Sequence, residues 1–324
     1  MGHSKLALTL VRLGSGYWQV FADRRLLAIL LLGCASGFPW AVIGSTFSYW
    51  LSAEGLSRAS IGVLGSVSMI YALNFLWAPF MDRYRLPWVC GRYGQRRGWI
   101  LVAQLGVVAG TLLIAWFGLG FGIGPVVLAA ALVVLAGSVQ DVAIDAYRIE
   151  LIPRDEERTM AAGSAAAAAG WWTGAGLPAA GAFFVAGATD DWGMAYRFLG
   201  FVALALIGLT LVLPEPKTRR VALQAEASSR ITADLMARGQ GETSARWQAQ
   251  LRVTVVEPFI EFFRRNGWRL GLAVLGFILL FKIGEAFLGR MAAVFYREIG
   301  FSAEQVGWVS GLLGWATMVG FILL

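Results

Sequence analysis

The sequence predicts an all-α protein, a polytopic bundle of transmembrane helices. Of its 324 residues, 58% are hydrophobic and 15% are charged, whereas a soluble domain carries roughly 25% charged residues. The mean hydropathy is +0.65, and the 40 glycines and 14 tryptophans are typical of closely packed helices and membrane interfaces. The net charge of +7 does not indicate nucleic-acid binding, because the basic residues gather in particular loops. The partner that composition predicts is a lipid bilayer.

About eight stretches approach the roughly 20 residues that a helix needs to cross the hydrocarbon. They are 26–50, 60–80, 99–119, 125–148, 160–186, 195–213, 270–293 and 305–324.

Each span has its own justification in the sequence. The first two are apolar with scattered polar and aromatic residues, and Pro39 is expected to kink the first. The third and fourth are separated by the uncharged loop 118–124, and the fifth is rich in Ala and Gly. Two aspartates precede the sixth span, two charged residues interrupt the seventh, and the eighth is apolar up to residue 324.

Basic residues set the expected orientation. Lys and Arg precede the first span and fill the segments between spans two and three and between spans four and five. The opposite loops are poor in them, since the loop after span one has only Arg58 and the loop after span three has none. By the positive-inside rule, we expect a cytoplasmic N-terminus.

A long polar segment follows the sixth span. Residues 214–269 contain ten Lys and Arg, and 252–269 is expected to form an amphipathic surface helix. Six spans, a long cytoplasmic segment and further spans resemble the layout of the major facilitator superfamily, whose two six-helix halves enclose a central site. We expect residues 1–213 to form the N-terminal six-helix half, 214–269 a cytoplasmic linker, and 270–324 the start of the C-terminal half. The resemblance implies twelve or more spans, so we interpret the chain as C-terminally truncated.

Charged residues at the ends of spans two to four form a candidate cytoplasmic gate. In the superfamily that the layout resembles, an Asp and basic residues of this loop pair across helix ends and latch the outward-open state. A plain positive-inside loop is the alternative interpretation, and the segment 84–93 is longer than in the usual motif. The candidate gate residues are Asp82, Arg83, Arg96, Arg97, Arg148 and Glu150.

Two carboxylates lie within the fourth span. Asp141 and Asp145 are four residues apart, so they lie on one face of a helix, and Arg148 follows Asp145 by one further turn. Ionisable residues within a span are costly and usually face the bundle interior or a water-filled cavity. We predict that Asp141 and Asp145 serve proton coupling or substrate contact; a cytoplasmic salt-bridge gate is the alternative.

A second charged pair interrupts the seventh span. Lys282 and Glu285 are three residues apart near its middle, where neither side chain easily reaches water. We predict a substrate or ion-pair site there. The alternative is a pair that only cancels its own charge, at a cost in desolvation.

Polar and aromatic residues of the first four spans are expected to line a central cavity, where aromatic faces suit sugar rings. Helix packing and the interfacial belt are the alternative for each of them. The expected lining residues are Ser36, Trp40, Tyr71, Asn74, Gln104 and Gln140.

The sequence lacks the usual arrangements for catalysis. The single histidine, His3, lies near the terminus, and no Gly-x-x-x-x-Gly-Lys-Ser/Thr nucleotide-binding loop occurs. We therefore expect a protein that is not an enzyme, with no catalytic residue, no metal and no cofactor. Transport would draw on an ion gradient, with protons as the coupling ion.

Five stretches together resemble the AmpG family of muropeptide permeases. They are 35–39, 75–79 with Asp82 and Arg83, 96–99, 141–150 and 281–287, in the family's order and across essentially the whole chain. Matched by position, the family's charged sites fall on the 82–97 loop, Asp141, Asp145, Lys282 and Glu285.

The resemblance implies proton-driven import of N-acetylglucosaminyl-anhydro-N-acetylmuramyl peptides across the bacterial inner membrane. This import serves peptidoglycan recycling and, in some bacteria, β-lactamase induction. We expect the transporter to be a monomer. Two alternatives stay open: another permease of the superfamily, for sugars, drugs or acetyl-CoA, and a truncated membrane protein that does not transport, such as a sensor or scaffold.

Overall fold

The structure, a computed structural model, describes residues 23–77, 80–81, 84–153, 155–216, 236 and 257–323. Within these residues the secondary structure is helical, which confirms the predicted all-α class. The elements are α2 (Arg24–Ile43), α3 (Ser45–Ala53), α4 (Arg58–Gly65), η1 (Ser66–Leu76), α6 (Val89–Tyr93), α7 (Gln95–Phe117), α8 (Ile123–Leu151), α9 (Glu157–Thr189), α10 (Trp192–Val212), α13 (Glu257–Glu298), α14 (Ala303–Val306), η3 (Gly307–Leu313) and α15 (Gly314–Leu323).

Five segments of the described chain are long and apolar enough to cross a membrane, and the protein is a multi-pass membrane protein. These segments coincide with the predicted first, third, fourth, sixth and eighth spans. The predicted second, fifth and seventh spans fall on α4 with η1, on α9 and on α13. The five segments are Arg24–Ala53, Gln95–Phe117, Ile123–Leu151, Trp192–Val212 and Ala303–Leu323.

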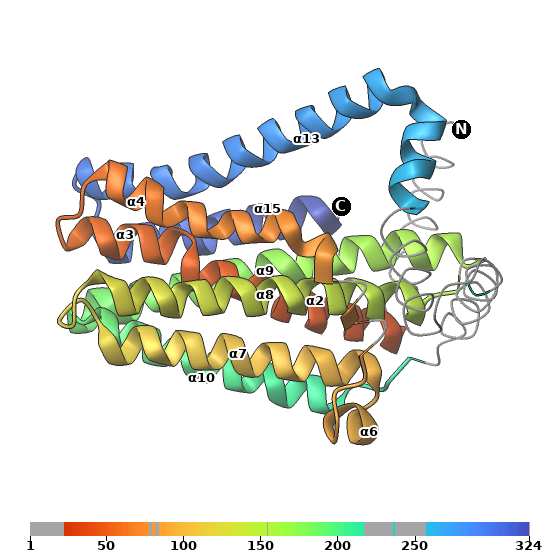
Figure 1. Cartoon of the computed structure of the whole chain (residues 1–324). Coiled ribbons are helices and arrows are strands. Elements are labelled where there is room, and N and C mark those ends of the chain that lie inside the picture. The colour runs from red at the N-terminus through yellow and green to blue at the C-terminus, as the bar shows by residue number, and fades with distance from the viewer. Residues whose placement is uncertain are drawn as a thin grey trace, which may run out of the picture.

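The helices run roughly parallel between two ends of the bundle (Figure 1). We call one the Glu150 end, where α2 begins and α8 ends, and the other the Glu298 end, where α3 turns into α4 and α13 finishes. α13 contacts α3, α4 and α14 and diverges from the other helices toward Gly267 (Figure 1). There a φ of 71°, which favours glycine, separates the segment 257–266 from the rest of α13.

Glycines set the distance between α2 and α9, which form the most extensive helix contact of the described bundle. A Cβ added at Gly37 would overlap the backbone carbonyl of Trp171. Small residues spaced four apart let two transmembrane backbones approach closely, and both helices use this spacing. The glycines at the contact are Gly33, Gly37, Gly170 and Gly174.

The first span is interrupted at Gly44 and not at Pro39, where the kink was expected. α2 continues through Pro39 to Ile43, and Gly44 breaks the helix with a ψ of −119°. A broken helix leaves carbonyls without partners, which is costly in hydrocarbon. The Val42 carbonyl instead accepts hydrogen bonds from the hydroxyls of Thr46 (3.3 Å) and Tyr196 (3.1 Å).

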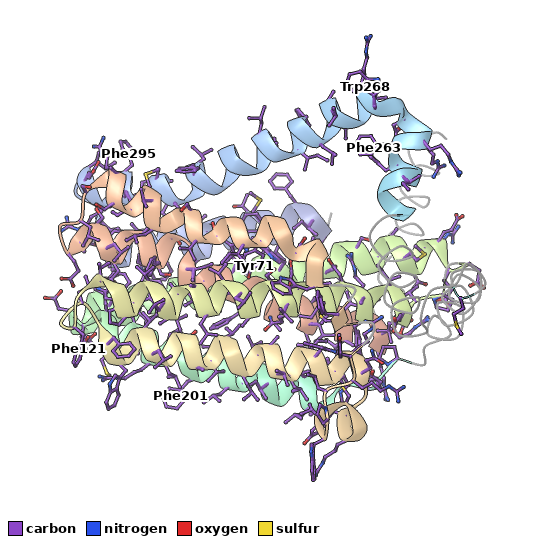
Figure 2. The ribbon with its side chains drawn as sticks, in the orientation of Figure 1. Tyr71, Phe121, Phe201, Phe263, Trp268 and Phe295 are labelled. Carbon is purple, nitrogen blue, oxygen red and sulfur yellow. The ribbon has the colours of Figure 1, made fainter. Side chains whose placement is uncertain are left out.

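Side chains from α2, α7, α8, α9 and α10 form one continuous apolar core, and Tyr71 lies near the centre of the bundle (Figure 2). Phe121 and Phe201 lie on its periphery (Figure 2) and are largely exposed, as expected for surfaces that face lipid. On the other side, α14, η3 and α15 pack along α9. There the indole of Trp315 donates a hydrogen bond to the Thr173 hydroxyl (3.0 Å).

Candidate functional site

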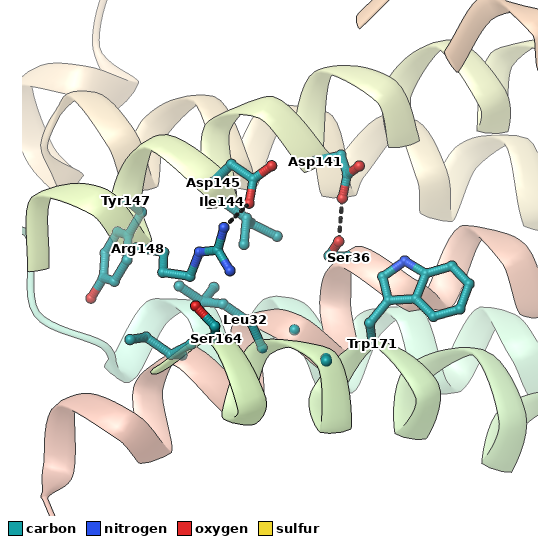
Figure 3. A pocket seen from close by; sticks show the side chains of 13 residues that line it. Leu32, Ser36, Asp141, Ile144, Asp145, Tyr147, Arg148, Ser164 and Trp171 are labelled. Atoms are coloured by element: carbon teal, nitrogen blue, oxygen red, sulfur yellow. Dashed lines mark hydrogen bonds and ion pairs between the residues drawn. The ribbon is translucent and has the colours of Figure 1, made fainter. Parts of the chain in front are cut away.

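A cavity of about 280 Å³ lies between α2, α8 and α9 (Figure 3). It occupies the half of these helices that lies toward the Glu150 end. Its walls are mainly apolar and contain a few polar and charged groups, which is typical of a small-molecule site. The lining residues are Ile29, Leu32, Gly33, Ser36, Asp141, Ile144, Asp145, Tyr147, Arg148, Ser164, Ala167, Ala168 and Trp171.

Helix α8 presents both predicted carboxylates to this cavity, one turn apart. The Ser36 hydroxyl of α2 donates a hydrogen bond to the Asp141 carboxylate (Figure 3). Asp145 pairs with Arg148 at 3.1 Å on its own helix, and its side chain is 62% exposed. Asp141 is only partly exposed, and among the described residues no cation pairs with its carboxylate, so the two carboxylates occupy different environments.

Gln140 fixes α8 against α2 beside Asp141. Its side-chain amide donates a hydrogen bond to the backbone carbonyl of Ala35, and the residue is buried. Such a bond between helices within a membrane holds their register, since no water competes for it. Gln140 therefore positions the carboxylate and does not itself line the cavity.

The other predicted lining residues lie outside the cavity walls. Trp40 packs against Trp171, which does line the cavity, with ring centroids 6.4 Å apart, and against Tyr71 at 5.7 Å. Gln104 lies between α7 and α10, where its amide donates to the Thr210 hydroxyl (2.9 Å). Asn74 is partly buried in η1. Among the six predicted residues, Ser36 is the one that lines the cavity.

Arg96 and Glu150 of the predicted gate form a buried ion pair between α7 and α8. Their closest nitrogen and oxygen atoms are 2.7 Å apart, and the side chains are 7% and 4% exposed. Arg148 pairs with Asp145 instead and faces the cavity. The remaining gate residues of the preceding loop, Asp82 and Arg83, lie outside the described residues.

Glu215 joins this cluster from the segment after α10, although it was not among the residues predicted from the sequence. Its carboxylate accepts hydrogen bonds from the backbone N–H groups of Arg96 (2.8 Å) and Arg97 (3.1 Å). An anion at a helix N-terminus satisfies free N–H groups and is favoured by the helix dipole. Gly94 has a φ of 90°, and a Cβ there would overlap the Glu215 carboxyl group. The sequence feature that could have indicated this role is an acidic residue between two prolines (214–216) directly after a span.

Arg97 and Tyr147 also bind the end of α10. The Arg97 guanidinium donates to the backbone carbonyls of Thr210 (3.3 Å) and Leu211 (2.5 Å), where a cation satisfies free carbonyls at a helix C-terminus. The Tyr147 hydroxyl donates to the Pro214 carbonyl (2.5 Å). Helices α7, α8 and α10 are thus tied together at the Glu150 end.

Arg25 ties the start of α2 to the segment before α9. Its guanidinium lies 2.7 Å from carboxylate oxygens of both Asp23 and Glu156. The side-chain hydrogen bonds from Arg25 hold the pKa of Asp23 and that of Glu156 below their ordinary values. Asp23 also accepts a hydrogen bond from the Arg25 backbone N–H (2.8 Å) and so caps α2.

Contacts at the Glu298 end join α13 to the first helices. Arg58 donates to Glu298 through Nε (2.6 Å) and through Nη2. The Tyr49 hydroxyl donates to the Phe301 carbonyl (2.8 Å), and the Tyr49 ring meets that of Phe183 edge-on. The Glu298 end is therefore closed between α3, α4, α9 and α13, while the cavity lies toward the Glu150 end.

The predicted pair in the seventh span cannot be placed at the level of its side chains. Lys282 and Glu285 lie in the middle of α13, and their side chains are outside the described part of the chain. One turn and a half beyond Glu285, the same helix carries Arg290. This buried charge was not singled out from the sequence, because an Arg close to a helix end resembles an interfacial residue.

Comparisons with known proteins agree with this architecture. The family model described as Major Facilitator Superfamily matches residues 29–324. The chain is 31% identical over 316 residues to the anhydromuropeptide permease of Escherichia coli (strain K12), covering 95% of the chain and 56% of the permease. It is 27% identical to putative transporter AmpG 4 of Rickettsia felis, covering 93% of the chain and 67% of that protein.

The chain spans just over half the length of the E. coli permease. Among solved structures, the D-xylose–proton symporter aligns with a TM-score of 0.41 and 14% identity, covering 92% of the chain and 84% of the symporter.

Proposed function

Because the chain belongs to the Major Facilitator Superfamily, we propose that it acts as a proton-coupled secondary transporter of anhydromuropeptides. In this proposal it imports N-acetylglucosaminyl-anhydro-N-acetylmuramyl peptides across the bacterial inner membrane, with its N-terminus in the cytoplasm. The relatives are permeases, which are transporters rather than enzymes. Support for the substrate comes from the 31% identity to an anhydromuropeptide permease. The basic residues at the Glu150 end support the orientation.

The observation that carries the proposal is the Asp141 carboxylate, held by Ser36 inside a cavity within the membrane-spanning part of the chain. A carboxylate at this depth is costly while it is ionised, so protonation lowers the cost of closing the cavity around it. Ser36 suits both forms: its hydroxyl donates to the ionised carboxylate, and it can accept a hydrogen bond from the protonated carboxyl. Asp141 can thus gain and lose a proton without losing its partner.

The rest of the cavity suits part of a sugar–peptide. Asp145, paired with Arg148, presents a carboxylate on one wall, where it can bind the amino group of a peptide. The Trp171 ring offers a flat apolar surface for a sugar ring on the opposite wall. A volume of about 280 Å³ is at the lower end for ligand pockets, so it accommodates one portion of such a substrate.

The proposal is tested by uptake of labelled anhydromuropeptide into proteoliposomes, with and without an imposed proton gradient. The E. coli permease serves as the positive control. We expect uptake by the chain that rises with the gradient and stops when a protonophore is added. Gradient-driven uptake by the E. coli permease alone would contradict transport by this chain. Uptake by the chain that ignores the gradient would contradict proton coupling.

A further inference from the structure

Arg290 of α13 carries a buried charge that the described residues around it stabilise only in part. The residue is 6% exposed. Its Nη1 donates a hydrogen bond to the backbone carbonyl of Gly65, between α4 and η1, and its Nε is buried without a hydrogen-bond partner among the described residues. Its guanidinium carbon lies 5.7 Å from the ring centroid of Trp40. Within the part of the chain that the structure describes, no carboxylate forms an ion pair with it.

Such a placement is costly unless another state of the protein compensates for it. A buried guanidinium that lacks a counter-ion has lost its water and regains only part of that energy from a carbonyl and an aromatic face. Charged residues within membrane-spanning bundles usually mark the path of a substrate or ion. An anion beside Arg290 would therefore stabilise its charge, and the described residues do not supply one.

Tyr71 contributes a second unsatisfied group beside the same tryptophan. Its hydroxyl is buried and has no hydrogen-bond partner among the described residues, and its ring packs on Trp40 with centroids 5.7 Å apart. Gly137 of α8 leaves room for this hydroxyl, since a Cβ there would overlap it. Arg290 and Tyr71 thus place two hydrogen-bond donors next to one aromatic ring.

Trp40 lies between Arg290 and the cavity that contains Asp141. One neighbour of Trp40 is Trp171, which lines that cavity, and another is Arg290, toward the Glu298 end. The space beside Arg290 is a second cavity of only about 10 Å³, roughly enough for one water molecule. A larger anion can enter this second cavity only when α13 shifts relative to α3 and α4.

We propose that Arg290 and the Tyr71 hydroxyl form an anion subsite that binds a carboxylate of the transported solute. The subsite lies beside the Trp40 ring, toward the Glu298 end from Asp141. It is occupied when the Glu298 end opens, and it is emptied when that end closes and Arg290 turns to the Gly65 carbonyl. This inference rests on the proposed function, and it adds where a carboxylate of the substrate's peptide binds.

The test is equilibrium binding to the full chain in lipid nanodiscs, with two matched ligands. One is a labelled anhydromuropeptide, and the other is the same compound with its peptide carboxylates converted to amides. We expect the unmodified protein to bind the carboxylate form about tenfold more tightly than the amide form, which corresponds to roughly 1.4 kcal/mol.

Variants test whether this preference for the carboxylate form arises at the subsite. Arg290→Gln should remove the tenfold preference by weakening the carboxylate form only, and Arg290→Lys should restore part of it. Tyr71→Phe, which removes one hydroxyl, should lower the preference about threefold. Arg297→Gln is the matched control, because Arg297 is an exposed arginine on the same helix, and it should keep the full preference.

Three results would overturn the subsite. They are equal binding of both ligands by the unmodified protein, a preference that survives in Arg290→Gln, and an Arg290→Gln variant that weakens both ligands equally. The last result would assign Arg290 a structural role. If Arg290→Gln does not fold, Arg290→Lys and Tyr71→Phe decide the question by the same comparison. Failure of the unmodified protein to bind either ligand would instead refute the proposed function.

Discussion

Replacing Arg96 alone is expected to damage the protein more than replacing Arg96 and Glu150 together. The two side chains form an ion pair at 2.7 Å and are 7% and 4% exposed. Arg96→Met removes the guanidinium that pairs with the buried Glu150 carboxylate. The double variant Arg96→Met/Glu150→Leu removes both charges from the interface between α7 and α8.

The burial sets the size of the effect. Breaking a buried pair from one side typically costs about 3–5 kcal/mol, whereas replacing both partners by apolar residues of similar volume is often nearly neutral. An exposed pair would contribute only about 0–1 kcal/mol. Because both side chains are almost fully buried, we expect about 3–5 kcal/mol for Arg96→Met and about 1–2 kcal/mol or less for the double variant.

The assay is a double-mutant cycle on the free energy of unfolding in detergent micelles. The four proteins are the unmodified chain, each single variant and the double variant. A coupling energy of about 2 kcal/mol or more is expected for residues that share one pair. Additive effects of the two single changes, or a double variant worse than either, would refute the pairing as the reason for their placement.

Three further predictions concern packing, pH and the cavity. Gly37→Ala should lower the free energy of unfolding by about 1–3 kcal/mol, because the added Cβ overlaps the backbone of α9. The control is Gly208→Ala, whose Cβ meets nothing and which should change the free energy of unfolding by no more than about 1 kcal/mol. Equal effects of the two changes would contradict the close α2–α9 contact. The hydrogen bonds from Arg58 hold the pKa of Glu298 below its ordinary value of about 4.3. The stabilisation from this pair is therefore complete above that pH and lost as the pH falls through the lowered value. The unfolding temperatures of the unmodified protein and Glu298→Gln should therefore converge progressively as the pH falls below about 4; a gap that does not narrow there would contradict the pairing. Ser36→Ala, which removes the hydroxyl bound to the cavity carboxylate, should slow gradient-driven uptake about tenfold, as expected for loss of a hydrogen bond to a charged group worth roughly 1.5 kcal/mol, and unchanged uptake would exclude that bond from the transport cycle.

The membrane character of the fold could be predicted from the sequence, because an apolar run of some 20 residues has few alternatives. The same holds for Asp141, Asp145 and Arg148, since spacing along one helix fixes which side chains share a face. Position within a single helix is a local property, and these residues do line one cavity.

Contacts between distant segments could not be predicted in this way. Gln104 and Gln140 were expected in a cavity, yet each binds a neighbouring helix, because a polar side chain in a span can serve either purpose. Glu215 reaches the N-terminus of α7 across more than a hundred residues of sequence, and no local pattern encodes that distance. Arg290 is buried by α3 and α4, so its environment depends on how helices assemble.

The kink expected at Pro39 shows a similar limit of prediction from the sequence. Proline removes one backbone hydrogen bond and often bends a helix, but the break in the first span is at Gly44. The position of the break depends on which neighbours can satisfy the freed carbonyls. Thr46 and Tyr196 do so near Gly44, and Tyr196 comes from α10, far away in the sequence.

The central claim is that Asp141 couples proton movement to transport of an anhydromuropeptide. The most direct measurement is the change in lumenal pH of proteoliposomes when this substrate is added outside, without any imposed gradient. We expect acidification of the lumen with the unmodified chain and with Asp155→Asn, a control at an exposed loop carboxylate, and no acidification with Asp141→Asn. Equal acidification by Asp141→Asn and the unmodified chain would contradict the claim.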